Sequence, residues 1–380
     1  MRFPRFPHDP GFPLILRAGR RARARLFERG GLCPEDVVGT LGASGGPKWL
    51  VLAAMDRVLM THLLAAGRRP RVHVGSSIGA WRAAIFAHPQ AAMLHERFLA
   101  LYLSYRHERG DGPSRTLART RAMLADLFPE SAAAAILDGA GRLAIVTARA
   151  RNRDLVGDGR WRLARGVLRL MLANARGRQR LARHVERVVF ADPRLPQLRF
   201  SDVVSTQRVA LTPANLQAAI LASSAIPFVI PPVRDPPGGP PGAYWDGGII
   251  DYHFAEPVGL PADMADGILL YPHFYTRLVP GWFDKPWTTR HRPGGILDDV
   301  LFLAPAPAFV RSLPMGRIPS RKDFRRLPDN DERIALWRRT VEACARLGEA
   351  LEWLLEGDRL LTLLAAQVPP GSSGVSGRPG

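Results

Sequence analysis

The sequence predicts an α/β fold in which a mainly parallel central sheet carries helices on both faces. From Val37 onward, apolar runs short enough for buried strands alternate with longer segments of helical pattern. Strands that alternate with helices form parallel sheets, and both faces of such sheets are covered. The chain has 380 residues, of which 46% are hydrophobic. It is therefore long enough for one large α/β domain with additions, or for two domains.

The expected elements follow from the order of these patterns along the chain. We expect strands at 37–41, 71–74, 143–147, 188–191 and 267–271. We expect helices at 49–64 and 80–86 and, as a helical insertion over the site, at about 90–140. A final helix from about Asp331 to Leu355 would place five apolar residues on or near one face: Ile334, Trp337, Val341, Ala345 and Leu351.

The same patterns suggest a division of the chain into four parts. Residues 1–31 mix proline, phenylalanine and arginine, and we expect an extended arm followed by a basic amphipathic helix. The main domain is expected at 32–278. A C-terminal extension that ends in a helix is expected at 279–368. Residues 369–380 are rich in glycine, serine and proline, which is typical of a disordered tail.

The charge of the chain is strongly positive, with a formal net charge of +19. Almost all of the basic residues are arginines, since Lys48, Lys285 and Lys322 are the only lysines. Apart from one dense run at 17–25, the arginines are spread along the sequence. This distribution is weak evidence for a nucleic-acid site, and we expect no specific nucleic-acid partner. A basic surface favours anionic lipid headgroups, so peripheral contact with an anionic membrane stays open.

The cysteines and the apolar runs limit which cellular compartment and which cofactors we expect for this protein. Cys33 and Cys344 are the only cysteines and form neither a metal-ligand spacing nor a disulfide framework. We therefore expect no metal and no cofactor. The apolar runs at 12–16 and 360–366 are too short for a signal-peptide core and a membrane span, respectively. These observations predict a cytoplasmic protein.

The most informative motif is Gly75-Ser76-Ser77-Ile78-Gly79, which lies between an expected strand and an expected helix. The spacing G-x-S-x-G is that of a nucleophile elbow, a tight turn that projects the serine hydroxyl clear of the main chain. Side chains at Gly75 and Gly79 would collide across such a turn. The helix that follows begins just after Ser77, and its free N–H groups point to where negative charge develops during acyl transfer.

A second glycine-rich turn, Gly42 to Lys48, follows the first strand. Adjacent glycines such as Gly45 and Gly46 let backbone N–H groups face a ligand, and Lys48 would anchor the loop or add positive potential. A phosphate-binding P-loop needs glycine before the lysine and serine or threonine after it. Here Pro47 precedes and Trp49 follows, which disfavours nucleotide binding. A plain structural turn is the other alternative.

A candidate acid lies at Asp246, which is followed by Gly247 and Gly248. Two glycines permit a tight turn, so that the carboxylate approaches another loop closely. Upstream, the segment from Ala219 to Pro227 is rich in small residues, which allow close helix packing.

Together these blocks resemble the patatin-like phospholipase family, whose motifs are a G-G-x-R/K loop, G-x-S-x-G, A-S-x-A-x-P and D-G-G/A. The matching segments are Gly45–Lys48, Gly75–Gly79, Ala222–Pro227 and Asp246–Gly248, in the family's order and within roughly Val37 to Phe274. Two features depart from the family pattern. Trp49 replaces a common glycine, and the loop begins Gly42-Ala43-Ser44. Both differences affect the expected width of the opening through which an acyl chain would enter the site.

The resemblance implies a serine–aspartate dyad without histidine, with Ser77 as nucleophile and Asp246 as base. The N–H groups of Gly45, Gly46 and Ile78 would form the oxyanion hole. Supporting roles in the loops would fall to Lys48, Gly75, Gly79, Gly247 and Gly248. The implied activity is hydrolysis of a lipid or another acyl ester through an acyl-enzyme, without a cofactor.

Alternatives remain open from the sequence. A Ser-Asp-His triad would use His253, His273 or His291, and Asp251 would replace Asp246 if the register differed. Ser76 is expected to form a hydrogen bond in the turn. Tyr102 and Tyr105 are expected to pack in the core, with contact to an acyl chain as the alternative. A different class of function is a non-catalytic protein that binds lipid or a partner.

Overall fold

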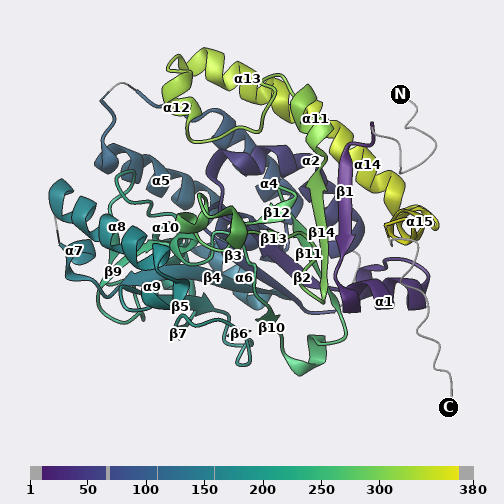
Figure 1. Cartoon of the computed structure of the whole chain (residues 1–380), viewed down its shortest axis with the longest axis horizontal. Helices are drawn as coiled ribbons and strands as arrows, with labels where there is room; N and C mark the ends of the chain where they lie inside the picture. Colours follow the sequence, from purple (N-terminus) through teal and green to yellow (C-terminus); the bar gives the residue numbers. More distant parts are fainter. Residues whose placement is uncertain (1–10, 66–68, 109, 158, 368–380) are drawn as a thin grey trace.

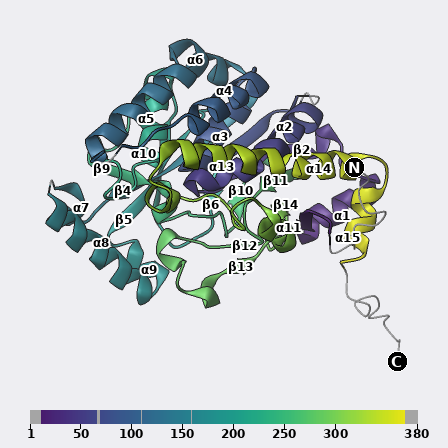
Figure 2. The same cartoon turned by 90° about the horizontal axis from the view of Figure 1, so that it is seen from above.

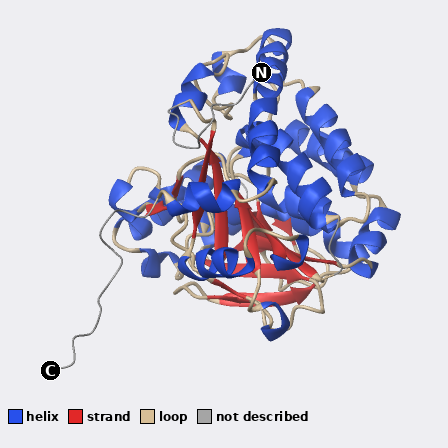
Figure 3. Ribbon diagram, turned by 90° about the vertical axis from the view of Figure 1, so that its right-hand side faces the viewer, coloured by secondary structure: helices blue, strands red, loops and turns tan. Residues whose placement is uncertain are grey.

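The computed structural model describes residues 11–65, 69–108, 110–157 and 159–367. Its centre is a ten-stranded sheet that lies among the helices (Figures 1 and 3). The main path runs β1-β14-β11-β2-β3-β4-β5-β7, with β9 paired to β4 and β8 paired to β9. The strands of this sheet are β1 (Leu14–Ala18), β2 (Val37–Gly42), β3 (Arg71–Ser76), β4 (Gly141–Ala150), β5 (Val185–Ala191), β7 (Thr206–Ala210), β8 (Val233–Arg234), β9 (Ala243–Asp246), β11 (Ile268–Pro272) and β14 (Val300–Pro305).

Helices cover both faces of this sheet, as the view from above shows (Figure 2). They are α1 (Arg20–Arg29), α2 (Ala53–Val58), α3 (Ile78–Ala87), α4 (Ala91–Leu103), α5 (Pro113–Leu127), α6 (Glu130–Asp138), α7 (Arg153–Val156), α8 (Arg160–Ala175), α9 (Arg178–Leu181), α10 (Pro213–Ser223), α11 (Pro307–Ser312), α12 (Asp323–Arg326), α13 (Asn330–Ala343), α14 (Ala345–Leu355) and α15 (Arg359–Ala365). Two small ribbons pair β6 (Arg199–Phe200) with β10 (Val258–Gly259) and β12 (Arg277–Leu278) with β13 (Arg292–Pro293).

The predicted fold class is confirmed. Strands β14, β11, β2, β3 and β4 run parallel to one another, and the strands that flank this group, β1, β5 and β9, pair with it antiparallel. Strand β4 shows that both faces are buried. Its Leu143 and Ile145 pack into one apolar cluster and its Ala144 and Val146 into another, as expected when successive side chains alternate across a covered sheet.

The register of the sheet brings the motif-bearing segments to one edge. Gly42, the last residue of β2, pairs with Gly75 near the end of β3. Strand β4 lies on the other side of β3, with Val146 opposite Ser76, and β9 pairs with β4 so that Thr147 lies opposite Asp246. The glycine-rich loop, the expected nucleophile and the expected acid therefore converge, although long stretches of sequence separate them.

The N-terminal segment departs from the prediction. Within the expected extended arm, residues 14–18 form strand β1, which is part of the main sheet and pairs antiparallel with β14 at its edge. Helix α1 forms as expected, but its arginines are not all free. Arg21 forms an ion pair with Asp299, and Arg25 bonds both Asp299 (2.8 Å) and the carbonyl of Gly267 (2.6 Å).

The expected boundaries at 31 and 278 are not followed by the sheet. Strand β14 lies beyond residue 278, yet it pairs with β11 and with β1 in the same sheet. Its residues from Val300 to Pro305 are all buried, because this apolar strand lies between β1 and β11. The tail at 369–380 lies outside the described residues.

The final helix is two helices, α13 and α14, which meet at Cys344. Ile334, Trp337 and Leu351 are buried as expected, and Val341 is half-buried. Ala345 is exposed. Ala345 is the first residue of the second helix. The prediction assumed one continuous helix with a single apolar face, and this face does not continue through Cys344 to Ala345.

Strand β1 gives a test of how firmly the N-terminal segment belongs to the core. Leu16 is fully buried, so Leu16→Ala should lower the free energy of unfolding by about 2–5 kcal/mol in denaturant titration. The matched control is Leu168→Ala on α8, where the residue is 52% exposed and the expected change is within about 0.5 kcal/mol. Equal, small effects of both variants would contradict the integration of β1.

Candidate active site

Ser77 occupies the turn between β3 and α3. Its backbone has φ +56° and ψ −128°, a conformation that costs free energy in a residue other than glycine. Two close approaches hold the turn. A Cβ on Gly75 would lie 2.2 Å from the carbonyl oxygen of Gly79, and a Cβ on Gly79 would lie 1.9 Å from that of Gly42. Glycine is thus required at both positions, for the steric reason expected from the motif.

A serine outside the turn fixes the Ser77 backbone. The N–H of Ser77 donates to Ser223 Oγ at 2.8 Å, and this hydroxyl donates to the carbonyl of Val146 at 2.6 Å. Ser223 lies in the Ala222–Pro227 block, whose local pattern gives no sign of this role. Ser76, as expected, forms a hydrogen bond in this region, with Ser44 Oγ at 3.0 Å.

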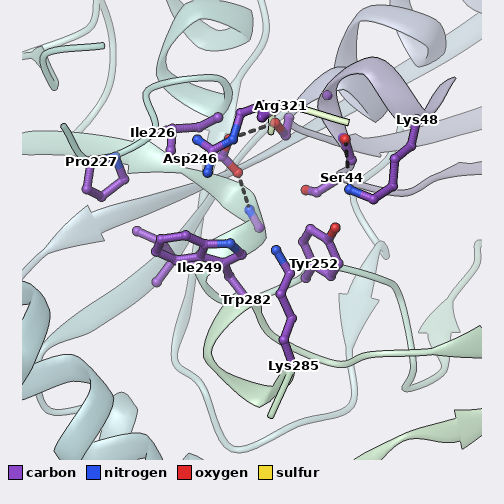
Figure 4. A pocket seen from close by; sticks show the side chains of 14 residues that line it. Ser44, Lys48, Ile226, Pro227, Asp246, Ile249, Tyr252, Trp282, Lys285 and Arg321 are labelled. Carbon is purple, nitrogen blue, oxygen red and sulfur yellow. Dashed lines mark hydrogen bonds between the residues drawn. The ribbon is translucent and has the colours of Figure 1, made fainter. Parts of the chain in front are cut away.

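Asp246 lies at the end of β9, and its side chain lines a pocket that Ser77 also lines (Figure 4 labels Asp246). Ser77 Oγ donates to Asp246 Oδ2 at 2.6 Å, and the N–H of Gly248 donates to Oδ1 at 2.7 Å. The two glycines after the acid are needed for space. A Cβ on Gly247 would lie 2.2 Å from the carbonyl oxygen of Val146, and one on Gly248 would lie 2.6 Å from Ser44 Oγ.

Burial changes the acidity of this carboxyl. Removal from water raises the pKa of Asp246 from its usual value to about 6, and the hydrogen bonds from Ser77 and Gly248 oppose the rise because they stabilise the carboxylate. Asp246 is consequently a stronger base than an exposed aspartate and is still mostly ionised at neutral pH.

The glycine-rich loop lines the same pocket as Ser77. Gly46 has φ +54°, a conformation that favours glycine. In the part of the chain that the structure describes, the N–H groups of Gly45, Gly46 and Ile78 donate to no protein acceptor. Gly45 and Gly46 line the pocket around Ser77, whereas Ile78 does not. The Lys48 ammonium donates to the carbonyl of Gly45 at 3.3 Å, consistent with an anchor for the loop.

These groups open into a pocket of about 460 Å³, counting the part open to solvent. Its lining residues are Ser44, Gly45, Gly46, Lys48, Ser77, Ile226, Pro227, Asp246, Gly248, Ile249, Tyr252, Trp282, Lys285 and Arg321. Sequence reasoning did not single out Tyr252, Trp282, Lys285 or Arg321 as site residues. They come from loops and from the short 3-10 helix Trp282–Asp284 after the acid motif, and no local sequence pattern marks them.

The pocket wall does not come from the helical insertion. The residues that line it include none from 90–140. Helices α4, α5 and α6 pack instead on α3 and α10, so they cover a face of the sheet rather than the site. Tyr102 packs its ring against Trp49 and Trp337, and Tyr105 packs against Phe324, as expected for core residues.

The alternative acid and bases have other partners. Asp251 forms a buried ion pair with Arg187 at 2.7 Å. His253 Nδ1 accepts from the N–H of Val279, His273 Nδ1 lies 2.7 Å from the carbonyl oxygen of Tyr275, and His291 Nε2 lies 3.1 Å from that of Asp284. Burial lowers the pKa of His273 to about 3 and that of His253 well below its usual value. Both therefore stay neutral inside the protein.

The fold and this site define an α/β protein with a serine on a strained turn between a strand and a helix and an aspartate hydrogen-bonded to this serine. The family model of the patatin-like phospholipases matches residues 43–258, which is more than half of the chain. The chain belongs to this family. A comparison with curated proteins found no match. Family membership supports lipid acyl hydrolysis as the general activity, with lipids as the general substrate class.

Two further searches concern the described residues alone. None of their helices has the length and apolar character needed to cross a membrane. No group of three or more histidine, cysteine, aspartate or glutamate side chains among them is arranged to hold a metal ion.

Proposed function

We propose that this protein is a serine acyl hydrolase that cleaves acyl esters of lipids through an acyl-enzyme on Ser77, with Asp246 as the base. The observation that carries the proposal is the direct 2.6 Å hydrogen bond from Ser77 Oγ to Asp246 Oδ2. A base within hydrogen-bond distance of the hydroxyl is what activation of a serine requires.

The steps follow from this geometry. Asp246 takes the proton of Ser77 as Oγ attacks the ester carbonyl, and the protonated acid then gives this proton to the departing alcohol. A water molecule, deprotonated by Asp246, attacks the acyl-enzyme and releases the fatty acid. The bond from Gly248 N–H to Asp246 Oδ1 keeps the other oxygen directed at Ser77 throughout.

The oxyanion of each tetrahedral intermediate needs donors that are already in position. The free N–H groups of Gly45 and Gly46 line the pocket beside Ser77. The N–H of Ile78 is the first of α3 and adds the positive end of the helix dipole. We assign the oxyanion hole to these three groups.

The dyad is tested by labelling with a fluorophosphonate and by hydrolysis of p-nitrophenyl esters of increasing chain length. Ser77→Ala should abolish labelling, and Ser77→Ala and Asp246→Asn should each lower kcat by at least about 10⁴-fold. Full activity in either variant would overturn the assignment. A folded wild type that neither labels nor hydrolyses would favour the non-catalytic lipid-binding alternative.

The controls for this test are the three histidines of the triad alternative. His253→Gln, His273→Gln and His291→Gln are made separately, and the fold of each variant is checked by circular dichroism. An enzyme that uses a serine–aspartate dyad should keep its activity in each of the three histidine variants. A folded histidine variant with a loss comparable to that of Ser77→Ala would replace the dyad by a triad.

The raised pKa of Asp246 predicts a pH dependence. The base acts only when ionised, and its ionised fraction falls as the pH falls through about 6. The value of kcat/KM for a neutral ester should therefore drop about tenfold for each pH unit below 6.

A second group near the site could titrate in the same pH range. The positive charges of Arg321 and Lys285 lower the pKa of Asp246, and the pKa of Lys285 is itself lowered to about 6. Lys285→Met separates the two groups, because the acid limb persists in this variant if Asp246 titrates and vanishes if Lys285 does.

We further propose that the protein contacts an anionic membrane through helix α8. Four large apolar side chains are exposed on this helix: Trp161 (88%), Leu168 (52%), Met171 (51%) and Leu172 (48%). Its buried residues, among them Val167, Leu170 and Ala173, lie on the opposite side. A helix with such a second apolar stripe fits the interface of a bilayer.

The charges around this stripe favour an anionic bilayer. Arg160 and Arg162 lie on the same helix and are exposed. No carboxylate of a described residue lies within ion-pair distance of them, whereas Arg165 and Arg169 pair with Asp154. The C-terminal end of α8 contacts the 3-10 helix Trp282–Asp284, since Asn174 Nδ2 donates to Asp284 Oδ1 at 2.8 Å, and Trp282 of this 3-10 helix lines the pocket. The helix that carries the proposed membrane contact is therefore in contact with one segment of the pocket wall. The cytoplasmic location stays a prediction.

Co-sedimentation with vesicles tests this contact. Binding to vesicles that contain phosphatidylglycerol should weaken at least about tenfold in Trp161→Ala/Leu168→Ala, because two apolar side chains no longer enter the interface. Phe27→Ala removes an exposed aromatic residue from α1 and should leave binding unchanged. Equal binding of wild type and double variant, or equal binding to pure phosphatidylcholine vesicles, would contradict the proposal.

A further inference from the structure

A buried arginine lies next to the segment that carries the base. Arg187 is on β5, and only 1% of its side chain is exposed. In the register of the sheet it lies opposite Ala148 of β4, which in turn lies opposite Trp245 of β9 (Figure 1). Residues directly opposite one another in a sheet share a face. The Arg187 side chain therefore leaves the sheet on the face of Trp245, the residue before Asp246.

Arg187 binds two carboxylates with one guanidinium group. Its Nε and Nη2 donate to Oδ2 and Oδ1 of Asp251 at 2.7 and 2.9 Å. Its Nη1 and Nη2 donate to Oδ1 and Oδ2 of Asp202 at 2.8 and 2.7 Å. The two acids are alike in burial, since the side chain of Asp251 is 10% exposed and that of Asp202 is 9% exposed. They differ in position, because Asp202 lies in the connection between β6 and β7, whereas Asp251 lies in the turn that follows Asp246.

Asp251 closes the turn that begins at the base. The N–H of Asp251 donates to the carbonyl of Gly247 at 2.8 Å. Within the same turn, the N–H of Gly248 donates to Asp246 Oδ1 at 2.7 Å. The direction of the second bond depends on the conformation of the turn, because the N–H lies in the plane of its peptide group. Whatever holds the turn therefore also orients the carboxylate of Asp246.

Two further contacts hold the same segment. Arg178 Nη2 donates to the carbonyl of Ile250 at 3.1 Å. The carbonyl of Tyr252 accepts from the N–H of Ser44, in the glycine-rich loop, at 2.9 Å. The pair with Arg187 is the strongest of these attachments, because it is bidentate and both of its partners are charged.

We propose that Arg187 and Asp251 are positioning residues, and that their bidentate pair holds the turn that follows Asp246 and so keeps the base directed at the nucleophile. The inference rests on the proposed function, in which Asp246 takes the proton of Ser77. A buried ion pair adds little net stability, because the loss of hydration offsets the attraction between the charges. Two parallel bonds between planar groups do fix a direction. A base needs a fixed direction, since a misplacement of about 1 Å can lower the rate about 100-fold.

The bond from Gly248 gives this role a signature in the pH profile. The bond stabilises the carboxylate and so lowers the pKa of Asp246. If the turn moves and the bond is lost, this pKa rises, and the acid limb of kcat/KM moves to higher pH. Loss of the Asp251 charge alone would act in the opposite direction, because a negative neighbour raises the pKa of an acid. Arg321 and Lys285 also act on Asp246, and the variants below leave both unchanged.

The test compares Asp251→Asn with Asp202→Asn, which has the same cationic partner, the same 2.7 Å ion-pair distance and nearly the same burial. Each variant leaves Arg187 with one carboxylate and one amide, so both should lose similar amounts of thermal stability. On a soluble p-nitrophenyl ester, Asp251→Asn should lower kcat at least about tenfold, with KM within about threefold of the wild-type value. It should also move the acid limb of kcat/KM to higher pH. Asp202→Asn should keep the kcat and the acid limb of the wild type.

A second variant, Arg187→Lys, serves if Asp251→Asn does not fold. Lysine keeps the positive charge but has no planar fork for two bidentate pairs, so this variant should also lower kcat and move the acid limb to higher pH.

The outcomes separate the positioning role from the hydrolase itself. Equal effects of Asp251→Asn and Asp202→Asn on kcat, or an unchanged acid limb in Asp251→Asn and Arg187→Lys, overturn the positioning role. They leave the hydrolase intact if turnover still needs Ser77 and Asp246. A folded wild type that neither reacts with a fluorophosphonate nor hydrolyses esters overturns both.

Discussion

The hydrogen bond between Ser77 and Asp246 is the interaction on which the arrangement of this molecule depends. Its two ends lie 169 residues apart in the sequence. They meet because β3, β4 and β9 are neighbours in the sheet, in a register that places Val146 opposite Ser76 and Thr147 opposite Asp246. A shift by a single residue in either pairing would move one partner to the other face of the sheet. The relative position of Ser77 and Asp246 is thus set by the register of the sheet.

The strained backbone of Ser77 shows how much of the surrounding structure serves this bond. A serine at φ +56° persists only where its neighbours leave no alternative. Here the close contact of Gly79 with Gly42, the hydroxyl of Ser223 and the start of α3 constrain the turn from three sides. Each constraint comes from a different element, so the strain is carried by the packed core.

The site divides sharply into residues that the sequence predicts and residues that it does not. Ser77, Asp246 and their glycines were predictable because turns that expose a catalytic group need particular residues at fixed local spacing. Lys285 and Arg321 carry no such pattern and reach the pocket only through the tertiary fold. The sheet divides in the same way. Strands β2, β3, β4, β5 and β11 were predicted from their apolar runs. Strands β1 and β14 were not, because their pairing joins distant parts of the chain, and neither was the short β9 that carries Asp246.

That pairing has a consequence for how the chain is made. Arg20 of α1 bonds Asp298, 278 residues further along, and β1 has no partner in the sheet until β14 exists. During synthesis the first strand therefore leaves the ribosome long before its neighbour, with its backbone groups and the apolar side of Leu14 and Leu16 unprotected. Contacts so distant in sequence form slowly. Closure of this sheet edge therefore has to wait for β14, and until then β1 cannot pair with its partner in the sheet.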